Sequence, residues 1–79
     1  MQVRVKYFAI LAEQAKCSEE VVQTAPCNCA DLYQKLQQEH NFSLPLSQLR
    51  VVVNEEFTVM DRLLQSGDEV VFIPPVSGG

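Results

Sequence analysis

The chain has 79 residues, is 47% hydrophobic and 20% charged, and carries a formal net charge of −4. Such a length fits one small domain, with little room for both a packed core and a deep catalytic cleft. The acidic balance and the scattering of the six Lys and Arg argue against binding to nucleic acid. No apolar run approaches the roughly 20 residues of a membrane span, and the N-terminus does not resemble a signal peptide. We therefore expect a cytoplasmic protein that binds neither membrane nor nucleic acid.

The first half of the chain predicts two strands and two helices. Residues 2–8 alternate between apolar and polar side chains, as in a strand with one solvated face, and residues 20–24 form a second strand that pairs with the first. Residues 9–16 between them are rich in helix formers. The main helix begins after Asn28, whose side chain suits an N-cap, and stops at Asn41. Its apolar stripe consists of Cys29, Leu32, Tyr33 and Leu36.

The second half predicts three more strands, at residues 49–53, 56–59 and 69–73. Asn54-Glu55 makes the turn between the first two of these, because Asn tolerates a positive φ. The first and last strands of the chain are strongly apolar, so we expect them to be central neighbours in the sheet. This order predicts an α+β fold in which a mixed sheet of about five strands packs on one main helix.

The three cysteines do not form a recognisable metal or redox motif. They lack the pair spacing of a zinc ribbon or a thiol–disulfide motif, and the chain has a single histidine. We interpret them as small buried or idle thiols and expect no metal site. These residues are Cys17, Cys27 and Cys29.

The polar residues do not indicate a catalytic site within this chain. His40, near the end of the main helix, is expected to be a surface residue that offsets the helix dipole. The adjacent acidic pairs Glu55-Glu56 and Asp68-Glu69 fall in turns, where their side chains point in different directions or into water. We find no nucleophile and base in a plausible arrangement, so the chain alone has no catalytic side chains.

The last six residues, 74–79, are the most distinctive part of the chain. Pro74 cannot donate a ladder hydrogen bond and should end the last strand, and a second proline favours an extended path. We therefore divide the chain into a folded domain, residues 1–73, and a flexible tail. The two closing glycines have no side chains, so a narrow channel can admit the tail as far as the carboxylate of Gly79. Adenylation by ATP would give this carboxylate a leaving group, which is the chemistry of a carrier.

The ending Pro74-Pro75-Val76-Ser77-Gly78-Gly79, after the strand that follows Gly67, resembles that of the small subunits of molybdopterin synthase. Val53-Asn54-Glu55-Glu56, and Pro26 with the helix after it, also lie where that family has them, so the resemblance spans nearly the whole chain. It implies a ubiquitin-like β-grasp fold and the role of a sulfur carrier. A bare Gly-Gly ending is less specific, because the thiamine sulfur carrier and ubiquitin-like modifiers share it.

The resemblance also implies a mechanism and a set of partners. An adenylyltransferase that resembles ubiquitin activators uses ATP to adenylate Gly79, and sulfur from a donor protein replaces AMP to leave a thiocarboxylate. The tail then enters the large subunit of molybdopterin synthase, within a heterotetramer, and gives its sulfur to cyclic pyranopterin monophosphate. The resemblance thus implies that the chain is the sulfur-donating part of an enzyme and holds no permanent cofactor.

Three alternatives to this hypothesis assign the chain to other functional classes of protein. A carrier of the thiamine pathway uses the same terminal chemistry, but the Pro-Pro-Val-Ser approach to the glycines disfavours it. A ubiquitin-like modifier forms an isopeptide bond with a lysine of its target. A plain interaction domain does not need Gly79 at all.

Three apolar side chains have no obvious place in the core. Phe8 falls on the polar face of the first strand, and Phe57 has polar neighbours in a short strand. Ile73 and its apolar neighbour Phe72 must point to opposite faces of the last strand, so they cannot both face the core. The family resemblance places the partner contact on this sheet face. We expect Phe8, Phe57 and Ile73 to form an exposed patch that the large subunit covers. The alternative is that all three are ordinary core residues.

Overall fold

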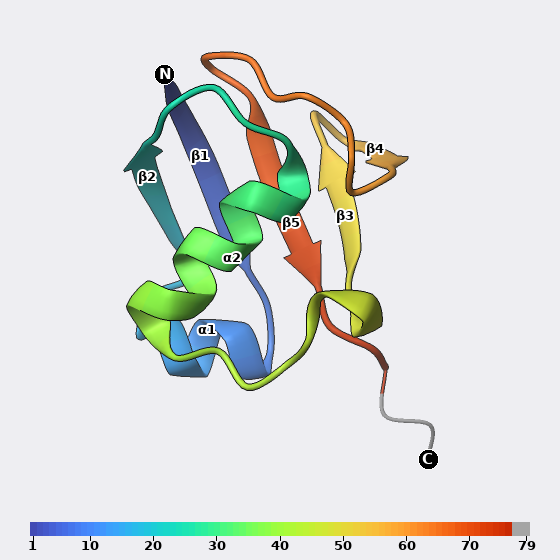
Figure 1. Cartoon of the computed structure of the whole chain (residues 1–79). Helices are drawn as coiled ribbons and strands as arrows, with labels where there is room; N and C mark the ends of the chain where they lie inside the picture. Colours follow the sequence, from blue (N-terminus) through green and yellow to red (C-terminus); the bar gives the residue numbers. More distant parts are fainter. Residues whose placement is uncertain (77–79) are drawn as a thin grey trace.

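The computed structural model describes residues 1–76, in which both helices lie on one face of a single sheet (Figure 1). The sheet has five strands in the order β2-β1-β5-β3-β4. The strands are β1 Gln2–Tyr7, β2 Glu19–Gln23, β3 Arg50–Val53, β4 Glu56–Thr58 and β5 Glu69–Ile73. β1 and β5 are parallel and the other pairs are antiparallel, which confirms the predicted mixed sheet.

The first and last strands are neighbours at the centre of the sheet, as predicted. Val5 pairs with Val70 and Tyr7 with Phe72, and all four side chains are buried. Along its other edge β5 pairs with β3, so it has hydrogen-bonded partners on both sides. Core strands of this kind are the elements of a fold that open least readily. The direction in which the chain leaves β5 at Ile73 is therefore well defined.

The main helix begins and ends at the residues that the sequence predicts. α1 spans Ile10–Ala15 and α2 spans Cys29–His40. The Asn28 side chain accepts a hydrogen bond from the Asp31 backbone N–H at 2.8 Å, and the Asp31 carboxylate accepts one from the Asn28 N–H, which completes a capping box. Asn41 ends α2 in the left-handed conformation, with φ at 57°. No helix in the described part of the chain is long and apolar enough to cross a membrane.

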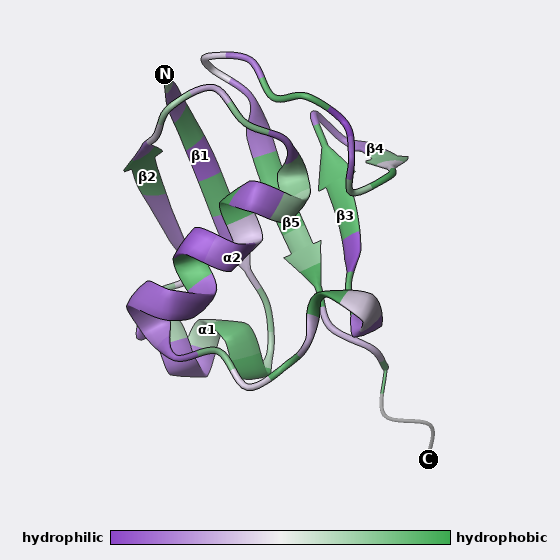
Figure 2. Ribbon diagram, viewed as in Figure 1, coloured by the Kyte–Doolittle hydropathy of each residue, from purple (hydrophilic) through white to green (hydrophobic). Residues whose placement is uncertain are grey.

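The core lies between the helices and one face of the sheet. Figure 2 shows hydrophilic residues along the outward side of α2 and hydrophobic residues along β3 and β5. A short 3-10 turn, η1 at Leu46–Gln48, leads into β3. The rings of Tyr33 and Phe42 stack with centroids 5.7 Å apart. The strands and α2 contribute Val3, Val5, Tyr7, Leu32, Tyr33, Leu36, Val51, Val53, Val70 and Phe72 to this core.

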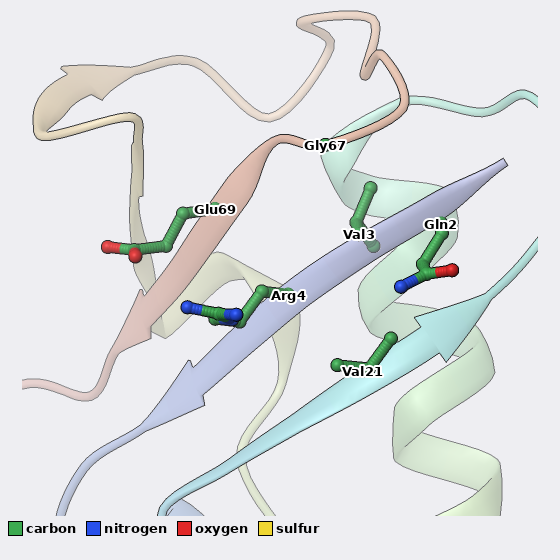
Figure 3. Close-up of a pocket in the computed structure, with 6 residues that line it drawn as sticks. All are labelled: Gln2, Val3, Arg4, Val21, Gly67 and Glu69. Carbon is green, nitrogen blue, oxygen red and sulfur yellow. The ribbon is translucent and has the colours of Figure 1, made fainter.

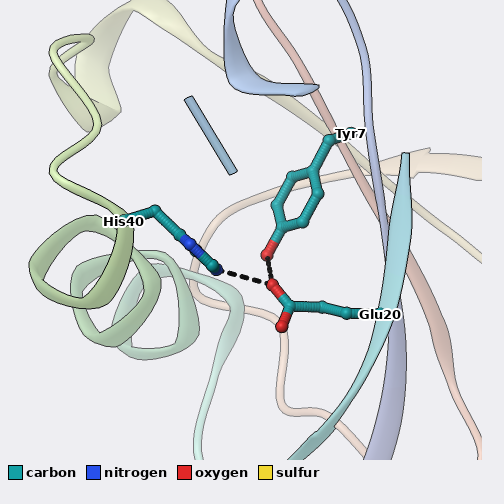
Figure 4. A network of polar contacts seen from close by, with 3 residues as sticks. All are labelled: Tyr7, Glu20 and His40. Atoms are coloured by element: carbon teal, nitrogen blue, oxygen red, sulfur yellow. Dashed lines mark hydrogen bonds and ion pairs between the residues drawn. The ribbon is translucent and has the colours of Figure 1, made fainter. Parts of the chain in front are cut away.

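A polar network joins β1, β2 and the end of α2 (Figure 4). One oxygen of the Glu20 carboxylate accepts a hydrogen bond from the Tyr7 hydroxyl at 2.5 Å and lies 2.7 Å from His40 Nε2. The His40 ring also packs against Phe42, with centroids 5.2 Å apart. The prediction that His40 is a surface residue is therefore wrong, since its side chain is only 20% exposed and connects α2 to β2.

A buried carboxylate holds the turn before β5. Asp68 is only 7% exposed while Glu69 is half-buried, so of the two predicted arrangements the pair points in different directions and Asp68 does not face water. Its oxygens accept hydrogen bonds from the Asn54 side-chain amide at 2.9 Å and from the Gln65 backbone N–H at 2.8 Å. Asn54 in turn accepts one from the Glu69 backbone N–H at 3.0 Å. These bonds compensate for the burial of the charge and attach the β3–β4 turn to the first residue of β5.

Alkaline pH should destabilise the fold through Tyr7. Burial, together with the Glu20 carboxylate beside the hydroxyl, raises the pKa of Tyr7 far above its usual value. Above about pH 10 the unfolded chain loses this proton while the folded chain keeps it, so the free energy of unfolding falls by about 1.4 kcal/mol per pH unit. Tyr7→Phe removes this contribution, and chemical denaturation between about pH 8 and pH 12 should show a flatter pH dependence in the variant. An equal dependence in both proteins would contradict this assignment.

Candidate functional site

The tail leaves the folded body at the end of the central strand. β5 ends at Ile73, and Pro74 has no N–H with which to continue the pairing. Pro74, Pro75 and Val76 lead away from the sheet (Figure 1), and Val76 is 91% exposed. Three predicted site residues lie outside the described residues, so their roles stay predictions. They are Ser77, Gly78 and Gly79.

The strand residues that point away from the helices form a second face of the sheet, which we call the open face. The strand register places Phe57, Val52 and Val71 in one row across β4, β3 and β5. Ile73 lies two residues further along β5 and therefore points to the same side. Phe8 follows Tyr7, the last residue of β1 and the partner of Phe72, so it lies near the end of β5. We call these five residues the apolar patch.

Two of the three predicted patch residues are open to solvent. Phe8 is 54% exposed and Phe57 is 69% exposed, so neither is a core residue, while Ile73 is half-buried. That a partner covers them stays a prediction. Val52 and Val71, which connect Phe57 to Ile73 across the strands, were not among the predicted patch residues. Their signal was the alternation within two apolar strands, in which every second residue must face away from the helices.

A hollow of about 250 Å³ opens near the other end of the central strands (Figure 3). Arg4, Val21 and Glu69 line it from β1, β2 and β5. Its other lining residues are Gln2, Val3 and Gly67, so the lining has no thiol, hydroxyl or imidazole group. The hollow lies where β5 begins, a full strand length from the root of the tail. We therefore do not assign the chemistry of the tail to it.

Comparison with protein families identifies the chain. The model of the ThiS family matches residues 5–79, which is nearly the whole sequence. The chain belongs to the ThiS family. Solved structures that resemble this chain extend the comparison to three dimensions.

Two similar solved structures are 27% identical to this ThiS-family chain. Haloferax volcanii SAMP1 matches with 100% of both chains covered and a TM-score of 0.82. A putative molybdopterin converting factor, subunit 1, from Pyrococcus furiosus matches over 96% of this chain and 99% of its own, with a TM-score of 0.83. A Helicobacter pylori complex of subunits 1 and 2 of molybdopterin-converting factor contains a chain that is 22% identical, with 100% of both chains covered and a TM-score of 0.69, which shows the fold alone.

These matches confirm the ubiquitin-like β-grasp fold, with its mixed five-stranded sheet and one main helix. They make the chain a sulfur carrier or a ubiquitin-like modifier of the ThiS family. Both roles depend on a surface that other proteins recognise and on the end of the chain. The apolar patch and the root of the tail, which meet at Ile73, are therefore the candidate functional site.

Cys27 and Cys29 of this ThiS-family chain lie outside that site. The Cys27 backbone carbonyl accepts a hydrogen bond from the Leu64 N–H at 3.0 Å, and the Cys29 N–H donates one to the Arg62 carbonyl at 3.2 Å, so both lie beside the segment that precedes β5. Burial raises the pKa of the Cys29 thiol and also that of Cys17. Such thiols stay protonated at neutral pH and are poor nucleophiles. Within residues 1–76, no three His, Cys, Asp or Glu side chains are grouped so that they could hold a metal ion.

Phe57 and Phe72 form a matched pair that distinguishes the open face from the core. Phe72 is fully buried, so Phe72→Ala should lower the free energy of unfolding by about 3–5 kcal/mol. Phe57→Ala should change it by less than about 1 kcal/mol, because the ring is mostly in solvent. Urea denaturation measures both values. A loss above about 2 kcal/mol in Phe57→Ala would place this residue in the core.

Proposed function

We propose that this chain is the sulfur-carrier subunit of molybdopterin synthase. The observation that carries the proposal is the ending Pro74-Pro75-Val76-Ser77-Gly78-Gly79, which follows directly after the central strand β5. Its resemblance to the small subunits of that enzyme favours this role over the other roles of the family. The identity of 27% to the Pyrococcus furiosus protein, along nearly the full length of both chains, supports the same assignment.

The reaction proceeds at the terminal carboxylate of Gly79. A carboxylate oxygen attacks ATP in the activating enzyme, pyrophosphate leaves, and an acyl-adenylate forms. The terminal sulfur of a persulfide on a donor protein then attacks the acyl carbon and displaces AMP, and a thiol cleaves the S–S bond of the resulting acyl disulfide, which leaves a thiocarboxylate and a disulfide on the donor side. This sulfur passes to cyclic pyranopterin monophosphate, and a second transfer completes the dithiolene. ATP is consumed by the activating enzyme, so the carrier itself holds no permanent cofactor.

The catalytic side chains and the pterin pocket belong to the large subunit. From Pro74 an extended tail of six residues reaches roughly 20 Å, so Gly79 can enter a partner's active site while the folded body stays outside. We place the large subunit on the apolar patch, because Ile73 belongs to the patch and is also the last residue before the tail. Covering the exposed rings of Phe8 and Phe57 removes apolar surface from water, which favours binding.

The proposed assembly is a heterotetramer of small and large subunits. The Helicobacter pylori chain of the same fold forms a complex with its subunit 2. A corresponding complex here would explain why Phe8 and Phe57 are exposed on this face. The adenylyltransferase and the sulfur donor are the other two partners that the chemistry requires.

A ubiquitin-like modifier is the second candidate function. The observation in its favour is the identity of 27% to Haloferax volcanii SAMP1, a small archaeal modifier protein. A modifier needs the same acyl-adenylate but then forms an isopeptide bond with a lysine of a target protein. A carrier of the thiamine pathway is less favoured, because of the Pro-Pro-Val-Ser sequence before the glycines.

Changes at the terminus should abolish sulfur loading without unfolding the domain. Deletion of Gly79, or addition of one alanine after it, displaces the carboxylate from the position where it reacts, and a misplacement of about 1 Å can cost about 100-fold in rate. After incubation with ATP, the activating enzyme and a sulfur source, the intact mass should show replacement of one oxygen by sulfur in the wild type alone. Thermal melting should be unchanged. Full loading of either variant would contradict the proposal.

Removal of the thiols should leave sulfur loading intact. Simultaneous replacement of Cys17, Cys27 and Cys29 by Ala should lower the melting temperature, because Cys29 is fully buried. The same intact-mass assay should still detect the thiocarboxylate. A variant that melts cooperatively but cannot be loaded would show that one of these thiols handles sulfur.

A further inference from the structure

Charge is distributed unevenly between the open face and the rest of the molecule. Three of the six Lys and Arg lie on the open face, at Arg4, Lys6 and Arg50, but only two of the ten Asp and Glu, at Glu19 and Glu69. The charges on the open face sum to +1. Those on the rest of the chain sum to −5, and the two together give the net charge of −4. The cations appear scattered in the sequence, but the strand register brings half of them to one face.

Two arginines stand near opposite ends of the apolar patch. Arg50 pairs with Ile73 in the strand register, so it lies beside the root of the tail. Arg4 pairs with Glu69 at the start of β5 and lines the hollow there (Figure 3). Both are exposed, and neither forms an ion pair within residues 1–76. The ammonium group of Lys6 lies 3.6 Å from the Glu69 carboxylate, so these two charges offset each other.

We propose that the protein surface which covers the apolar patch carries carboxylates on its rim, opposite Arg4 and Arg50. The inference rests on the proposed function in that this surface belongs to the large subunit, and it adds the chemistry that the surface must have. A guanidinium group binds a carboxylate through two parallel hydrogen bonds, which fixes both position and direction. An apolar centre with a charged rim is the usual anatomy of a specific interface.

Orientation matters because the tail must enter one narrow channel. A carboxylate that meets Arg50 also positions Ile73 and so fixes where the tail enters the partner. A second carboxylate opposite Arg4 fixes the rotation of the body about that point. Apolar side chains alone define no such direction. Exposed rim charges act mainly on the rate of association and on specificity, and contribute less to affinity.

A membrane surface or a nucleic acid matches this face less well than a protein does. Either of these presents negative charge over a wide area, and the chain outside the open face has a net charge of −5, which such a surface would repel. At physiological ionic strength the field of a charge decays over about 8 Å. A protein whose carboxylates are confined to the rim can therefore meet the arginines without meeting the acidic side of the chain.

The test is the rate constant for association with the purified large subunit of molybdopterin synthase from the same organism. Arg4→Glu and Arg50→Glu reverse the two unpaired cations. Lys16→Glu makes the same charge change at the end of α1, outside the open face, and is the matched control. Glu69→Gln removes a carboxylate from the open face and so changes its charge in the opposite direction. Stopped-flow measurements at low and high salt give the rates, and thermal melting verifies that each variant is folded.

We expect the double variant Arg4→Glu/Arg50→Glu to associate about 10-fold more slowly than the wild type at low salt, and Lys16→Glu to stay within about 2-fold. Glu69→Gln should associate faster than the wild type. High salt should bring the rates together, because it screens these charges. If the large subunit binds but the double variant associates as fast as the wild type, the acidic rim is contradicted and the proposed function is not. The same holds if Lys16→Glu slows association as much as the double variant does. Absence of any binding by the wild type would overturn the proposed function and this inference with it.

Discussion

The parallel pairing of β1 with β5 is the interaction on which the rest of the structure depends. It brings the first and last strands together at the centre of the sheet and sets both faces at once, with Val5 and Val70 in the core and Lys6 and Val71 on the open face. A slip of one residue would exchange the two faces and move Phe72 from the core into solvent. The same register decides which residue ends the sheet, and therefore where the tail begins.

The two ends of β5 differ in how firmly the chain is held. At the start, the buried Asp68 and the side chain of Asn54 attach the strand to the β3–β4 turn. At the other end, Pro74 stops the pairing and the chain leaves the body. A firmly held strand that continues into a projecting tail is the geometry that a terminal group needs to react inside another protein. In the proposed function, a domain of this size contributes to catalysis inside its partner and not in a pocket of its own.

Elements that depend on neighbouring residues could be predicted from the sequence. The caps of α2, its apolar stripe and the alternation that exposes Phe57 each need only a few adjacent positions. His40 was misjudged and the burial of Asp68 was not predicted, because their partners, Glu20 and Asn54, come from distant segments. The gathering of cations on the open face also depends on strand order, which no local pattern contains. The ending of the chain could be interpreted directly, because its expected chemistry resides in the last residues themselves.

The central claim is that this chain delivers sulfur from its terminus to a pterin. The most direct measurement uses the thiocarboxylated chain with isotopically labelled terminal sulfur, the large subunit and cyclic pyranopterin monophosphate. Mass spectrometry then follows the label in both the pterin and the protein. We expect labelled sulfur in the dithiolene of the product and a regenerated carboxylate on Gly79. An unlabelled pterin, with the chain instead joined through Gly79 to lysines of other proteins, would contradict the carrier role and identify a modifier.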